Sequence, residues 1–116
     1  MATQAEIKAQ IEARIKGKPY AHVKAEYYEP INAAWDKASA ELNAFVKAQG
    51  PNAVYPNGLT CDRVKAMPEY RALRIKCEQA GEKAKLFNAV FTRIFKKEHA
   101  QDIANARNAK WAALCA

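Results

Sequence analysis

The sequence predicts an all-α protein: an elongated antiparallel helical hairpin with flanking N- and C-terminal helices, a small helical bundle that forms one domain over residues 1–116. Half of the residues are apolar, and only four are Gly and five are Pro, a composition that favours helix. Two long segments repeat apolar residues every three or four positions, which is the helical period. A segment rich in turn-forming residues separates them.

The first helix is expected over residues 3–16. The segment TQAE at 3–6 has the pattern of a capping box, in which a hydroxyl and a carboxylate satisfy backbone amides at a helix start. Isoleucine then recurs at Ile7, Ile11 and Ile15, and Gly17 ends the helix.

The second helix is expected over residues 19–49. Pro19 suits its first turn, and Gly50-Pro51 ends it. Pro30 interrupts the helical pattern. Because proline lacks an N–H group and its ring clashes with the preceding turn, we expect a kink or break near Tyr28–Glu29.

The third helix is expected over residues 68–98, with a final helix reaching about residue 114 at a changed angle. Its apolar seam extends over more than three heptads and consists of Tyr70, Leu73, Cys77, Ala80, Ala84, Phe87, Phe91 and Ile94. We expect burial of Leu73, Phe87, Phe91 and Ile94 against Ile31, Trp35, Leu42 and Phe45. Gly81, beside the seam, permits close helix contact. The same seam allows a homodimer as an alternative.

Turn residues dominate the connection between the two long helices, and Thr60 is placed to cap a short helical turn through Ala66. The connection also carries apolar side chains at Val54, Tyr55 and Leu59. Either these three side chains fold back and cap the closed end of the hairpin, which is the favoured alternative, or they form a protein-binding loop.

Two segments without a carboxylate hold seven basic residues, namely Arg14, Lys16, Lys18 and Lys24 in one, and Arg93, Lys96 and Lys97 in the other. An antiparallel hairpin brings these segments together, and we call the seven residues the basic pole. Of the 19 Lys and Arg residues, the other twelve equal the twelve Asp and Glu residues, so the pole accounts for the formal net charge of +7.

Basic residues beside aromatic rings suit phosphate contact and base stacking. Tyr20, Arg107, Lys110 and Trp111 are candidates to extend the pole in this way. The competing interpretation is structural: cations in the last turn of a helix stabilise its dipole, and Arg14, Lys16, Lys96 and Lys97 all fall in predicted last turns.

No catalytic or cofactor motif is present in the sequence, which predicts a protein that is not an enzyme and needs no cofactor. Cys61, Cys77 and Cys115 predict reduced thiols in a cytosol, with Cys77 in the core and the other two incidental. A zinc site built from Cys61, Cys77 and one histidine lacks metal-ligand spacing. No apolar run is long enough for a membrane span and no secretory signal is found, so we expect a cytoplasmic protein with no membrane partner.

The segments YPNGLTCDRVKAMPEYRAL at 55–73 and LFNAVFTRIFKKE at 86–98 resemble small uncharacterised proteins encoded by phages and prophages of proteobacteria. Cys61 stands where such relatives often carry proline. The resemblance covers about half of the chain. It implies a helical protein of mobile-element origin in a bacterial host cell, and it transfers no catalytic residue.

Two functions follow as hypotheses. The first is a non-enzymatic accessory protein that binds nucleic acid or a nucleoprotein complex through the basic pole. The alternative is an inhibitor that blocks a bacterial host factor, for example a CRISPR or other defence complex. It would dock the pole on an acidic protein surface or use the loop at 51–59.

Overall fold

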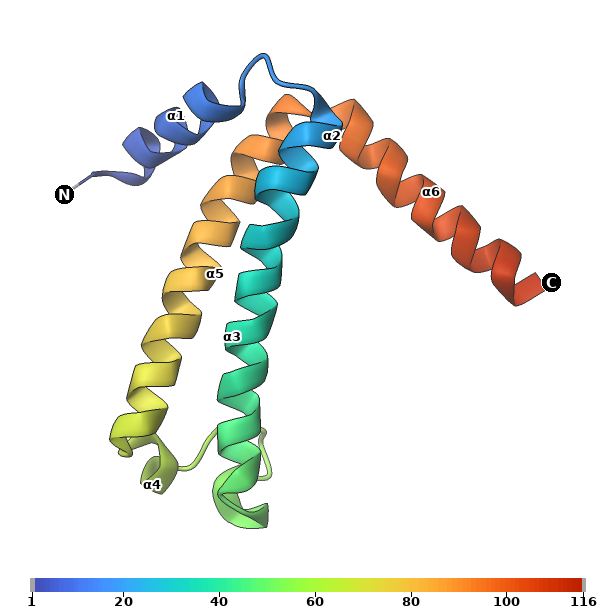
Figure 1. The fold of residues 1–116 in the computed structure, drawn as a ribbon. Coiled ribbons are helices and arrows are strands. Elements are labelled where there is room, and N and C mark those ends of the chain that lie inside the picture. The colour runs from blue at the N-terminus through green and yellow to red at the C-terminus, as the bar shows by residue number, and fades with distance from the viewer. Residues whose placement is uncertain (1, 116) are drawn as a thin grey trace. The chain divides into compact units, whose positions relative to one another are not determined.

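The computed structural model describes residues 2–115, and these residues form helices without any strand, apart from one isolated bridge (Figure 1). The predicted all-α fold is therefore confirmed. The elements are α1 (Gln4–Ile15), α2 (Tyr20–Val23), the π-helix η1 (Lys24–Tyr28), α3 (Glu29–Ala48), the 3-10 helix η2 (Pro51–Ala53), α4 (Asp62–Lys65), α5 (Pro68–Ile94) and α6 (Lys96–Cys115). They form two compact units. Of the described residues, the first comprises 2–28 and 86–115, and the second comprises 29–85.

In the second unit, α3 and the first part of α5 pack antiparallel (Figure 1). Ser39 Oγ lies 3.4 Å from Cys77 Sγ, and the Lys76 ammonium lies 3.0 Å from Glu41. A Cβ atom at Gly81 would lie only 2.8 Å from Nε1 of Trp35. The close helix contact expected at Gly81 is therefore present, with the indole ring occupying the space of a missing side chain.

The end of this unit near the connection has its own apolar core. Val46, Ala53, Cys61, Val64 and Tyr70 are buried, and Leu42, Phe45 and Met67 pack against them. The predicted roles of the cysteines are partly wrong: Cys61 is buried in this core, whereas Cys77 is only half-buried and Cys115 is exposed.

The connection folds into a short turn held by backbone hydrogen bonds. The amide of Cys61 donates to Ala53 at 2.8 Å and the amide of Tyr55 donates to Leu59 at 2.8 Å. Gly58, with φ of +86°, supplies the left-handed residue that this turn requires. Buried Ala53 and Cys61 cover the core here, so the expectation that Val54, Tyr55 and Leu59 would do so is wrong, and these three side chains are exposed.

In the first unit, α1 ends before Gly17, whose φ of +81° terminates it as expected. The break considered near Tyr28–Glu29 is absent, because the helix continues from α2 through the π-helix η1 directly into α3; what marks the position is the change from α- to π-helix before Pro30. Pro30 cannot donate to the carbonyl of Glu26, and a wider π turn makes room for its ring.

This unit is built around an aromatic cluster, which consists of Tyr20, Tyr27, Tyr28, Phe87, Phe91, Phe95 and His99. Phe91 lies at its centre: it is fully buried, and its ring centroid lies 4.6 Å from that of Tyr28 and 5.5 Å from that of Tyr20. The predicted burial of Phe87 and Phe91 is confirmed, whereas Leu73 and Ile94 are only half-buried. The stacking partners of the two phenylalanines include tyrosines that the seam did not predict.

The third helix ends at Ile94, not at residue 98 as predicted, and α6 leaves in a new direction after Phe95 (Figure 1). Phe95 itself is buried, with its ring edge-on to Tyr20 at 5.4 Å. The turn therefore keeps this ring in the cluster, while the amides of Phe95 and His99 still donate to carbonyls four residues back.

Candidate nucleic-acid interface

The basic pole lies within the first unit, where contacts join the segments that carry it. The ring of Tyr20, four residues before Lys24, contacts that of Phe95, directly before Lys96. The Arg93 guanidinium lies 2.8 Å from the Glu12 carboxylate on α1. Segments about 80 residues apart in the chain are thus brought together, as the hairpin requires.

Two of the seven cations are engaged in ion pairs that sequence reasoning missed. Arg93 pairs with Glu12, and the Lys24 ammonium lies 2.9 Å from Asp102. Both carboxylates belong to neighbouring segments, so counting charges within the basic segments could not reveal them. The first unit holds ten Lys and Arg against five Asp and Glu, a net +5, and the second holds nine against seven, a net +2. The first unit, which contains all seven residues of the basic pole, therefore carries +5 of the formal net charge of +7.

Six cations of the pole are exposed, and Arg93 is one of them although it pairs with Glu12. The other five are Arg14, Lys16, Lys18, Lys96 and Lys97. We call them the five exposed cations, and within the described residues none of them forms an ion pair. The Lys18 ammonium is held 3.3 Å from the hydroxyl of Tyr27 and 5.3 Å from its ring centroid. These contacts orient Lys18 without neutralising it.

The helix-dipole interpretation accounts for only part of this set. Arg14 and Lys16 do lie at the C-terminal end of α1, where cations are favourable. Lys96 and Lys97, however, lie in the first turn of α6, immediately after α5 ends. Cations are unfavourable at a helix N-terminus. The C-terminus of α5 lies next to them and attracts cations, but this attraction at most cancels the unfavourable effect of the α6 N-terminus. Their position therefore has no explanation in helix stability.

Tyr20 is not available as a stacking platform for a ligand. Its ring packs on Phe91 and Phe95, and its hydroxyl donates to Asp102 at 2.5 Å. Burial, and next the hydrogen bond to Asp102, raise the pKa of the Tyr20 hydroxyl, while the hydrogen bonds from Tyr20 and then Lys24 lower the pKa of the Asp102 carboxyl. The hydrogen bonds that Tyr20 and Lys24 donate to Asp102 connect α6 to α2 and η1, so the role of Tyr20 in the site is structural.

The other candidate extensions lie on α6 and are accessible. Arg107, Lys110 and Trp111 are exposed, and 61% of the Trp111 surface is accessible. With about 100° between successive residues, these three share one side of α6 with Lys96. Glu98 and Asp102 fall on the other side.

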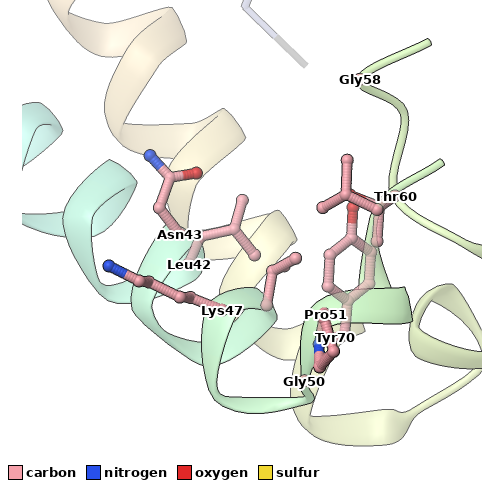
Figure 2. A pocket seen from close by; sticks show the side chains of 10 residues that line it. Leu42, Asn43, Lys47, Gly50, Pro51, Gly58, Thr60 and Tyr70 are labelled. Carbon is pink, nitrogen blue, oxygen red and sulfur yellow. The ribbon is translucent and has the colours of Figure 1, made fainter. Parts of the chain in front are cut away.

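The second unit has a hollow beside the exposed loop, with a volume of about 580 Å³ (Figure 2). Figure 2 shows Leu42, Asn43 and Lys47 on one side of it and Thr60 and Tyr70 on the other. A second hollow of about 360 Å³ also includes Leu59 in its lining. The walls of the larger hollow are mainly apolar, so it is better suited to binding an apolar side chain of a partner than to catalysing a reaction.

Within residues 2–115, no group of three or more His, Cys, Asp or Glu side chains is placed to hold a metal ion, and no helix has the length and apolar character for a bilayer span. No protein-family model, curated protein or solved structure matches the chain.

Proposed function

We propose that this protein is a non-enzymatic accessory protein that binds nucleic acid, or a nucleoprotein complex, in the cytoplasm of a bacterial cell. The observation that carries this proposal is the set of five exposed cations in one unit, two of which occupy a helix start where they do not stabilise the helix. Cations without carboxylate partners are what phosphate contacts use. An accessory role also fits the resemblance to phage-encoded proteins.

Charge reversal tests the proposal. Lys96→Glu with Lys97→Glu should weaken binding of a short DNA or RNA about tenfold or more at low salt, with little dependence on sequence. The helix should tolerate the change, because acidic residues favour a helix N-terminus.

The matched control is Lys37→Glu with Lys83→Glu. These two lysines are exposed and lie in the middle of α3 and α5, away from the helix ends, and the two substitutions lower the net charge by the same amount. Equal weakening by both pairs would reduce the effect to net charge alone. Absence of binding by the unaltered protein at low salt would end the proposal.

A second candidate function is the blocking of a bacterial host protein. The observation that favours it is the exposure of Val54, Tyr55 and Leu59 beside the hollow of the second unit. Leu59 is the better probe, because the Tyr55 hydroxyl also accepts the hydrogen bond of the Asp62 amide, which starts α4. Leu59→Asp should abolish capture of a host protein, while Ile75→Asp, a change at a comparably exposed residue on α5, should not.

The two candidates separate in one comparison. If capture survives Lys96→Glu with Lys97→Glu but not Leu59→Asp, the loop is the working surface. If capture is lost only with the lysines, the basic pole docks on an acidic protein surface.

A further inference from the structure

The last three turns of α6 pack against nothing within the described residues. Every residue from 105 to 115 is exposed, including Trp111 at 61% and Leu114 at 68%. A large indole left in water forgoes burial of roughly 150–250 Å² of surface. A helical arm of this kind, rich in alanine and therefore able to persist as helix, presents its side chains to a ligand.

The distribution of charge on α6 identifies the chemistry of that ligand. All four cations of the helix, Lys96, Lys97, Arg107 and Lys110, fall within an arc of about 140° around its axis at 3.6 residues per turn. Its two carboxylates lie outside that arc, and Asp102 is already occupied by Tyr20 and Lys24. No Asp or Glu follows Asp102 in the sequence. The exposed side is therefore complementary to a polyanion.

Trp111 distinguishes between kinds of polyanion. It lies within the arc of the cations, one turn after Arg107 and directly after Lys110. In a duplex each base face is covered by the next base, whereas a single strand leaves base faces open for stacking on an aromatic ring. An exposed indole between phosphate-binding cations adds contact only when unpaired bases are present.

We propose that α6 is a single-strand-binding arm, in which Lys96, Arg107 and Lys110 contact phosphates and Trp111 stacks on an unpaired base. This inference rests on the proposed nucleic-acid function and specifies its substrate as single-stranded nucleic acid. From Lys96 to Lys110 the arm covers about 21 Å at 1.5 Å per residue, a length that several nucleotides of an extended strand can follow.

Tryptophan fluorescence tests the stacking directly, because the chain has only two tryptophans. In a Trp35→Phe protein the signal comes from Trp111 alone. Oligo-dT and oligo-U should quench it, whereas inorganic polyphosphate, which has charge but no bases, should bind without comparable quenching. Quenching by polyphosphate to the same extent would overturn the assignment of stacking.

Affinities measured in the native background provide a second readout, independent of how well Trp35→Phe folds. Trp111→Leu should weaken oligo-dT or oligo-U binding about 5- to 150-fold, the range for loss of one stacked base, and Trp111→Phe should restore most of it. Leu114→Ala, which alters an equally exposed apolar residue on the same helix, should have little effect.

The outcomes that contradict the single-strand assignment differ from the outcome that contradicts the proposed function. If Trp111→Leu leaves single-strand affinity unchanged, or weakens oligonucleotides, duplex and polyphosphate equally, the single-strand assignment is wrong while the basic surface stands. If no polyanion binds at low salt, the proposed function itself fails.

Discussion

Replacing Phe91 with alanine should strongly destabilise the first unit. The side chain is fully buried, and its ring contacts those of Tyr20, Tyr28, Phe87, Phe95 and His99 at centroid distances from 4.6 to 5.7 Å. A buried Phe→Ala change costs about 3–5 kcal/mol, and aromatic pairs add about 0.5–1.5 kcal/mol each without being additive. We therefore expect a loss near the upper end, about 4–5 kcal/mol.

Urea unfolding followed by circular dichroism measures this loss as a change in the free energy of unfolding. Hydrogen exchange localises it, since the amides of residues 20–28 should lose protection first. Ile75→Ala, at a half-exposed position on the same helix, should change stability by no more than about 0.5 kcal/mol. A loss below about 1 kcal/mol for Phe91→Ala would refute the aromatic cluster as the core of this unit.

Two further predictions concern particular contacts. Gly81→Ala should gain up to about 1 kcal/mol of helix propensity but lose about 1–3 kcal/mol to the clash with Trp35; net destabilisation is expected in urea unfolding, and a more stable variant would contradict the close contact. Folding raises the pKa of Tyr20, so the contacts of its neutral hydroxyl contribute their full stability below about pH 10, the unfolded value, and lose it at higher pH. Folding lowers the pKa of Asp102, so the contacts of its ionised carboxylate contribute their full stability above about pH 3.9, the unfolded value, and lose it at lower pH. Tyr20→Phe should therefore lose less stability than the unaltered protein as the pH rises above 10 or falls below 4, and unchanged pH profiles would argue against this hydrogen bond.

Local sequence signals predicted much of the fold. The period of apolar residues defined the long helices, because one buried side of a helix imposes it. Pro30 and Gly17 acted through their own backbone geometry, which neighbours change little. Gly81 was recognisable as a contact point because it has no side chain and lies beside the apolar seam.

The remaining features depend on residues far apart in the chain. The pairs Arg93–Glu12 and Tyr20–Asp102 join positions separated by 81 and 82 residues. The second pair exists because α6 turns away after Phe95, and residues 95–98 contain neither Gly nor Pro to signal that turn. Periodicity identifies which side of a helix is buried but not where the next helix goes. The same limit hid the ion pairs that neutralise Lys24 and Arg93.

The salt dependence of nucleic-acid binding tests the central claim most directly, which is that the five exposed cations contact phosphates. Affinity for a short duplex should fall with a log–log slope of about −4 to −5 against salt concentration, at about −0.9 per phosphate neutralised. For a single strand, at about −0.7 per phosphate, the slope should be about −3.5 from the five exposed cations and about −5 when Arg107 and Lys110 on α6 also contact phosphates. Lys96→Glu with Lys97→Glu should make the duplex slope about 1.8 shallower. A slope near zero, or one that the two substitutions leave unchanged, would contradict the assignment of this surface to nucleic acid.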